Sequence, residues 1–240
     1  RDRSPSRGLG DVYKRQKYNN QEHISVYVKQ LDTDRVAAIN DEKSMYAASI
    51  AKLGVLYYAQ ERLSQKKLSL SNEYQYTSTV NGFPGAYDPD GSGKISKMTD
   101  DKNYSLENLL KAVAQNSDNV ATNILGYYVA NQYDNSFQKS VDKASATSWN
   151  MDKKELTARA AGTLMEAIYR QNGDIINYLS STDYDGERIS KNIDVPVAHK
   201  IGDAYDFKHD VAIVYTDSPF ILSIFTDKEG YDKILSLIHI

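Results

Sequence analysis

The chain has 240 residues, of which 40% are hydrophobic and 25% charged, and it contains no cysteine. This composition is typical of a folded domain with a buried core, and it excludes a disulfide framework, a thiol nucleophile and Cys-ligated zinc. The net charge is −3, and no long basic run lies outside the N-terminal segment, so the positive surface that nucleic-acid binding needs is missing.

The two ends of the chain differ from the body. Residues 1–16 hold five Lys and Arg against two Asp and show no hydrophobic periodicity. This stretch resembles translated sequencing-library adapter, and so do residues 236–240. We therefore expect a non-native or disordered leader at 1–16, a folded domain over 17–235 and a non-native tail at 236–240. The body without the leader is moderately acidic.

The first expected elements are a strand hairpin and a helix. From His23 to Asn40, β-branched and aromatic residues alternate on both sides of Asp32-Thr33-Asp34, which predicts two paired strands. The apolar run from Met45 to Leu63 then predicts a buried helix that begins near Ser49.

The centre of the chain, from about residue 64 to 188, predicts a helical lobe, and the end predicts strands. Apolar residues recur at intervals of three and four in residues 105–114, 119–130 and 156–170. Strand patterns then occupy residues 195–202, 210–216 and 219–226. We therefore expect an α/β (α+β) fold in which both chain ends build an antiparallel sheet of about five strands around an inserted all-helical lobe.

The spacing S-x-x-K on a helix places a hydroxyl and an amine on the same face, so a partly buried lysine can accept the serine proton. The pattern occurs at Ser49/Lys52, Ser64/Lys67, Ser136/Lys139 and Ser140/Lys143. The last three pairs lie in polar segments, which favours a solvated helix face or loop. Only Ser49 begins an apolar helix after a strand pair, so Ser49 and Lys52 are the candidate nucleophile and base.

Two further polar groups follow along the chain. Ser117-Asp118-Asn119 stands at a helix boundary, where these residue types favour a helix cap over a catalytic element if the triplet is taken alone. His199-Lys200-Ile201-Gly202 falls on a predicted strand, where a lysine among apolar neighbours needs a carboxylate or an anionic ligand. An ordinary edge-strand lysine is the alternative.

Taken together and in this order, the three elements resemble the S-x-x-K, S-D-N and K-T-G signature of class A β-lactamases and low-molecular-mass penicillin-binding proteins. Flanking residues agree, with Ala48 before the first element, Gly91-Ser92-Gly93 ahead of the second, and Asn123 closing S-D-N-x-A-x-N. The resemblance covers roughly residues 22 to 235, and it implies a serine hydrolase acting on amide bonds.

The resemblance implies catalytic roles for four residues. Ser49 would be the acylated serine, and Lys52 would be its base. Ser117 would relay the proton to the leaving nitrogen, and Lys200 would hold the proton network together and attract the substrate carboxylate.

Three more residues, Asn119, Gly202 and Asp203, would bind substrate. Asn119 would hold the amide side chain of the substrate. The backbone N–H groups of Ser49 and Asp203, which follows Gly202, would form the oxyanion hole.

Two departures from the family pattern bear on function. Ile201 stands where the family has Thr or Ser, which removes a hydroxyl donor to the substrate carboxylate. Class A β-lactamases also carry an E-x-x-L-N loop whose glutamate activates the deacylating water, yet residues 133–151 contain no glutamate. Glu155 and Glu166 are the remaining candidates for that base, and we expect deacylation to be slow.

No metal or cofactor is expected. Asp88 to Gly93 matches the opening of a calcium-binding loop, but Thr99 replaces the glutamate needed at position twelve, which favours a polar turn. His23, His199 and His209 lack zinc-site spacing.

The sequence thus predicts a class A β-lactamase-like serine hydrolase that forms an acyl-enzyme with β-lactams or D-Ala-D-Ala-type peptides. The alternative is a catalytically weak penicillin-recognising or cell-wall-binding module. The expected partner is a small-molecule β-lactam or a peptidoglycan stem peptide, with no nucleic acid. We expect a monomer that is extracellular or in the cell envelope, with membrane association only through an N-terminal segment missing from this sequence.

Overall fold

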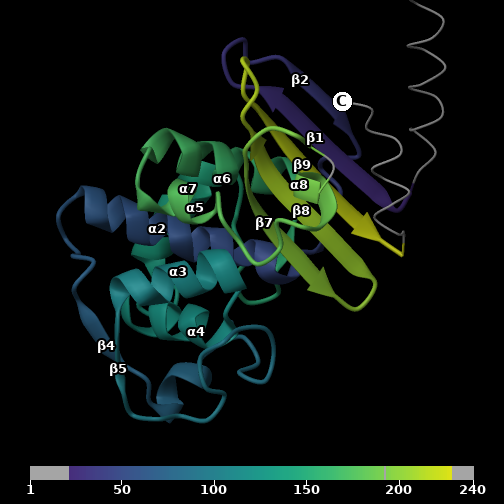
Figure 1. The fold of residues 1–240 in the computed structure, drawn as a ribbon. Coiled ribbons are helices and arrows are strands. Elements are labelled where there is room, and N and C mark those ends of the chain that lie inside the picture. The colour runs from purple at the N-terminus through teal and green to yellow at the C-terminus, as the bar shows by residue number, and fades with distance from the viewer. Residues whose placement is uncertain (1–21, 192, 229–240) are drawn as a thin grey trace, which may run out of the picture.

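The computed structural model describes residues 22–191 and 193–228, so the expected leader and tail lie outside the described part of the chain. Figure 1 shows a sheet beside a helical lobe. The described elements, in chain order, are β1 (Ile24–Gln30), β2 (Val36–Ile39), β3 (Met45–Tyr46), η1 (Ala48–Ala51), α2 (Lys52–Ser64), β4 (Glu73–Gln75), η2 (Ser78–Asn81), β5 (Asn103–Ser105), α3 (Leu106–Asn116), α4 (Asn119–Tyr128), α5 (Asn135–Ser145), β6 (Glu155–Leu156), α6 (Ala158–Gln171), α7 (Asp174–Tyr178), α8 (Arg188–Lys191), β7 (Val197–Ala204), β8 (Phe207–Val214) and β9 (Phe220–Asp227).

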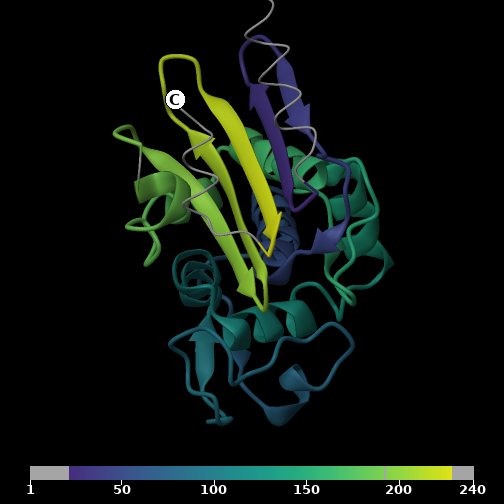
Figure 2. The same ribbon diagram turned by 90° about the vertical axis from the view of Figure 1, so that its right-hand side faces the viewer.

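Both ends of the described chain build the main sheet, as the sequence predicted. Its five antiparallel strands run in the order β2-β1-β9-β8-β7. Figure 2 shows β1 and β9 side by side, although they come from opposite ends of the described chain. This pairing leaves β7 at one edge of the sheet, next to the helical lobe.

Helices cover both faces of the sheet. On one face α6 packs so closely that a Cβ on Gly162 would lie 2.6 Å from the ring of Tyr27. On the other face Ile189 of α8 joins a buried apolar cluster with Ile24, Leu222 and their neighbours. Burial on both sides explains why β8 and β9 consist mainly of consecutive apolar residues.

The lobe surrounds α2, whose Leu53, Val55 and Leu56 are fully buried. It is mostly rather than wholly helical, which corrects the expectation of an all-helical insertion. Two pairs of short strands, β4 with β5 and β3 with β6, connect the helices and satisfy backbone groups that would otherwise lack partners. None of the described helices is long and apolar enough to cross a membrane.

Candidate active site

Ser49 lies in η1, the single turn that precedes α2. Its neighbours Ala48, Ile50 and Ala51 are buried, whereas Ser49 is partly exposed. Ala48 has a left-handed backbone with φ of 49°, which costs an L-residue roughly 1–2 kcal/mol. The buried packing of η1 holds this conformation, and it presents Ser49 at the end of α2. The helix therefore starts at Lys52, preceded by a 3-10 turn, close to the position that the sequence predicted.

Strand β7 lies directly against η1 at Gly202. A Cβ on this glycine would meet the backbone oxygen of Ala47 at 2.6 Å and Cγ1 of Ile50 at 2.9 Å. Only glycine permits so close an approach. The structure thus brings the strand that carries Lys200 and Asp203 beside the turn that carries Ser49.

Lys52 is completely buried, and its amine lies among oxygen acceptors. Nζ donates to the backbone oxygen of Ser117 at 2.6 Å and to Oδ1 of Asn119 at 2.6 Å, and it lies 3.2 Å from Oγ of Ser117. Burial lowers the pKa of Lys52 well below its ordinary value, and the nearby cations Lys200 and Lys154 lower it further, against an opposing effect of Asp118. The surroundings of Lys52 therefore favour the neutral form of its amine, the form that can accept a proton.

The triplet at the α3–α4 junction is both a helix cap and part of the site. Asp118 caps α4, because its carboxylate accepts from the N–H of Ala121 at 2.8 Å. Ser117 ends α3 in a left-handed conformation, and its side chain turns toward both lysines. Asn119 also donates to the backbone oxygen of Asp88 at 2.8 Å. The cap interpretation and the catalytic interpretation are therefore compatible.

Lys200 completes a chain of polar groups with Ser117. Its amine is buried and donates to Oγ of Ser117 at 2.8 Å and to the backbone oxygen of Ile201 at 2.9 Å. Burial lowers the pKa of Lys200 to about 7, with Asp210 opposing and Arg188 adding to the decrease. The hydroxyl of Ser117 thus lies between two buried amines whose pKa values are both lowered.

The other side of Lys52 is aromatic and cationic. The amines of Lys52 and Lys154 lie 4.6 Å and 4.5 Å from the centre of the Tyr87 ring. Tyr87 donates its hydroxyl to the backbone oxygen of Ala48 at 3.0 Å. Trp149 is fully buried and donates from Nε1 to the backbone oxygen of Ala51 at 3.2 Å. Segment 147–156 therefore packs directly on the turn that carries Ser49.

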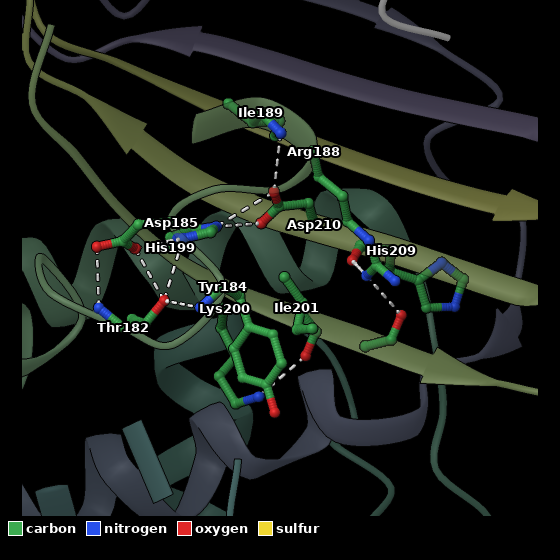
Figure 3. A network of polar contacts seen from close by, with 11 residues as sticks. Thr182, Tyr184, Asp185, Arg188, Ile189, His199, Lys200, Ile201, His209 and Asp210 are labelled. Carbon is green, nitrogen blue, oxygen red and sulfur yellow. Dashed lines mark hydrogen bonds and ion pairs between the residues drawn. The ribbon is translucent and has the colours of Figure 1, made fainter. Parts of the chain in front are cut away.

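The opposite face of β7 holds a second polar network, drawn in Figure 3. His199 and Lys200 point to opposite sides of the strand, as successive strand residues do. His199 contacts Asp210 at 3.0 Å through Nδ1 and Asp185 at 3.0 Å through Nε2. Burial opposes the charged form, yet the two carboxylates raise the pKa of His199 above its ordinary value. This network attaches segment 182–189 to the back of β7.

Arg188 belongs to that segment and reaches the end of the site. It donates to the backbone oxygens of His209 at 2.7 Å and Gly202 at 3.2 Å, and it forms an ion pair with Asp203 at 2.5 Å. Arg188 is buried, whereas the side chain of Asp203 is 50% exposed. A cation thus supports β7 next to the residue expected to supply an oxyanion-hole N–H.

The two candidate deacylating glutamates lie elsewhere. Glu155 is exposed in β6, where its backbone pairs with Tyr46. Glu166 is on α6 and forms ion pairs with Lys29 at 2.9 Å and Arg170 at 3.5 Å. Within the described residues, no carboxylate accepts a hydrogen bond from Lys52.

The structure therefore brings together Ser117, Asn119 and both lysines, with Ser49 and Gly202 in adjoining segments. Sequence reasoning missed Tyr87, Lys154 and Arg188. Tyr87 is one of nineteen tyrosines, and Lys154 and Arg188 lie in polar stretches without a motif. No local signal distinguishes these residues, because long-range packing alone places them at the site.

Comparison with known proteins agrees with this architecture. A family model described as "Beta-lactamase enzyme family" matches residues 9–239. A comparison with curated proteins gave no significant match.

Three solved structures illustrate the similarity of fold. A point mutant of PBP-A, in an acyl-enzyme complex with penicillin G, has a TM-score of 0.77 and 14% identity over 96% of this chain and 94% of that chain. A beta-lactamase from Sphaerobacter thermophilus has a TM-score of 0.73 and 16% identity over 92% and 89% of the two chains. Penicillin binding protein 6B from Escherichia coli has a TM-score of 0.74 and 14% identity over 90% and 74%.

Proposed function

The chain belongs to the beta-lactamase enzyme family, and from this membership we propose that it is a serine hydrolase that forms an acyl-enzyme through Ser49. Its substrates are β-lactams or D-Ala-D-Ala-type peptides. The observation that carries the proposal is a buried series of side-chain hydrogen bonds, from Lys52 to Ser117 and from Lys200 to Ser117. It lies beside the partly exposed Ser49. The penicillin adduct of the PBP-A mutant, a protein of similar fold, supports it.

The proposed acylation step moves protons between these hydrogen-bonded side chains. Ser49 Oγ attacks the carbonyl carbon of the scissile amide, and its proton passes to the neutral amine of Lys52. The backbone N–H groups of Ser49 and Asp203 stabilise the negative charge on the carbonyl oxygen. The C–N bond then breaks, its electron pair stays on nitrogen, and Ser117 gives that nitrogen a proton. Lys52 returns a proton to Ser117, so both residues end in the protonation state in which they began.

Release of the acyl group is expected to be slow. Hydrolysis of the ester needs a base within hydrogen-bond reach of a water molecule, and such assistance is worth about 10² to 10⁴ in rate. Beside Lys52 the structure has Tyr87 and Lys154, neither of which is a carboxylate, and both candidate glutamates are engaged or exposed elsewhere. An enzyme with an ordinary turnover of about 10 per second would then keep its acyl group for seconds to minutes.

The mass of the intact protein after incubation with penicillin tests the acylation site. The wild type should gain the mass of one penicillin, and Ser49→Ala should gain none. Ser64→Ala is the matched control, since Ser64 belongs to an exposed S-x-x-K pair and its removal should leave labelling intact. If Ser49→Ala still gained the mass of penicillin while Ser64→Ala did not, Ser49 would not be the acylation site.

The lifetime of the adduct tests the slow release. Mass-resolved decay should show a persistent penicilloyl form. Steady nitrocefin hydrolysis at several turnovers per second, without an accumulating adduct, would contradict the proposal.

The second candidate function is a catalytically weak penicillin-recognising or cell-wall-binding module. Ile201 favours it, because this side chain cannot donate a hydrogen bond to a substrate carboxylate. Retention of penicillin without a gain in covalent mass would select this alternative.

For either function we propose an extracellular or cell-envelope location, where the D-Ala-D-Ala peptide lies, and a monomer.

A further inference from the structure

The end of the site around residues 201–203 differs in charge from a simple carboxylate-binding pocket. Ile201 is buried and apolar, so it offers no donor to an anion. Asp203 adds a carboxylate that is half exposed. This carboxylate is attached to the residue whose N–H is proposed to bind the scissile carbonyl, so covalent geometry keeps it within about 5 Å of that N–H.

The cation nearest to this carboxylate already has an anionic partner. Arg188 pairs with Asp203 and also donates to the backbone oxygens of Gly202 and His209. Figure 3 shows its side chain extending from α8 toward β7 and β8. An incoming substrate carboxylate would therefore compete with the carboxylate of Asp203 for the same guanidinium, and it would be repelled by that carboxylate.

The second cation is also engaged. The amine of Lys200 is buried and donates to Ser117 and to the backbone oxygen of Ile201. Because the pKa of Lys200 is about 7, a substantial part of its positive charge is absent at neutral pH. Arg188 is therefore already paired with an anion, and Lys200 carries only part of a positive charge at neutral pH.

We propose that this site prefers acyl donors whose leaving-group side carries no free carboxylate, such as an amide or an ester, over the same donors with a free carboxylate. The inference rests on the proposed acylation of Ser49 and ranks its substrates: benzylpenicillin and D-Ala-D-Ala-type peptides, which carry this carboxylate, would be slower donors than their neutral amide or ester forms. Ile201 offers no hydroxyl to an anion, and the carboxylate of Asp203 disfavours a second anion.

The test compares benzylpenicillin with its methyl ester as acylating agents for the full chain at pH 7. The rate of mass gain at Ser49 should be larger for the ester, by roughly fivefold, the factor that one charge–charge contact at about 4 Å gives in bulk water. Asp203→Asn should lower the ester-to-acid rate ratio by a similar factor, because it removes the competing anion. Asp206→Asn is the matched control, since it removes an exposed charge three residues away and should keep the wild-type ratio.

Ile201→Thr provides a second variant if Asp203→Asn does not fold. It restores a hydroxyl donor and should also lower the ratio. A wild-type protein that reacts at least as fast with the acid as with the ester would overturn the inference and leave the proposed acylation standing. The absence of any mass gain at Ser49 with both compounds would overturn the proposed function and the inference together.

Discussion

The two sides of the pocket around Lys52 differ in what they can do with protons. On the relay side, formed by Ser117, Asn119 and Lys200, hydroxyl, amide and amine groups make a continuous buried chain. On the aromatic side, formed by Tyr87, Trp149 and Lys154, the groups are rings and a second buried amine. In the proposed mechanism the first side carries a proton from Ser49 to the leaving group, whereas the second side, as defined here, contains no carboxylate to activate water. The proposed mechanism thus assigns the making of an acyl-enzyme to one side of the pocket and leaves its release without a base on the other.

Removal of the amine that both sides share should have the largest effect. Lys52→Met should lower the rate of acylation by about 10² to 10⁴, because no base then accepts the proton of Ser49. The measurement is the rate of mass gain with penicillin. Lys67→Met, which removes the exposed lysine of another S-x-x-K pair, is the control. Equal rates in the two variants would show that Lys52 is not the base.

A smaller effect is expected from disturbing the packing of the aromatic side on α2. A Cβ on Gly54 would lie 2.6 Å from Nε1 of Trp149. Gly54→Ala gains helix propensity worth about 1 kcal/mol, but overpacking typically costs about 1–3 kcal/mol, so we expect a net loss in the free energy of unfolding. Urea denaturation measures this free energy. Gly186→Ala is the control, because a Cβ there would meet nothing within 4 Å. Equal stability of the Gly54→Ala and Gly186→Ala proteins would contradict the predicted contact with Trp149.

The influence of the aromatic side on the relay side should appear in the pH profile of acylation. Acylation needs neutral Lys52, so its rate rises as pH increases through the pKa of that residue. The positive charge of Lys154 lowers this pKa, and Lys154→Met should therefore raise it and move the profile to higher pH. On the acidic side of the profile the rate should fall roughly two- to tenfold. Lys153→Met, which removes an exposed neighbouring lysine, should leave the midpoint of the pH profile at its wild-type value. The same midpoint in Lys154→Met and Lys153→Met would show that Lys154 does not affect the pKa of Lys52.

The smallest effect expected is none. Glu155→Gln and Glu166→Gln should leave the decay rate of the penicilloyl adduct within about twofold of the wild type, because Glu155 is exposed in β6 and Glu166 pairs with Lys29 and Arg170. Mass-resolved decay is the measurement. A tenfold slower decay in either variant would identify that glutamate as the base and remove the contrast between the two sides.

Local patterns predicted most of the framework. Alternation predicted β1, β2, β7, β8 and β9, and the spacing of apolar residues predicted α2, α3, α4 and α6. The strand pairs β4–β5 and β3–β6 were missed, because segments of two or three residues contain too few positions to show a period. The order of the three motifs, in turn, was enough to indicate the family.

The sequence by itself determined the fold class and the residues Ser49, Lys52, Ser117, Asn119 and Lys200 as candidates, because each lies in a motif or at an element boundary that short-range physics defines. Only the tertiary structure decided what surrounds them. The Tyr87 ring beside Lys52, the amine of Lys154 on the same ring and the ion pair of Arg188 with Asp203 join segments that are distant in the chain or lie outside any motif. The charge state of a buried amine depends on neighbours within a few ångströms, and packing chooses those neighbours.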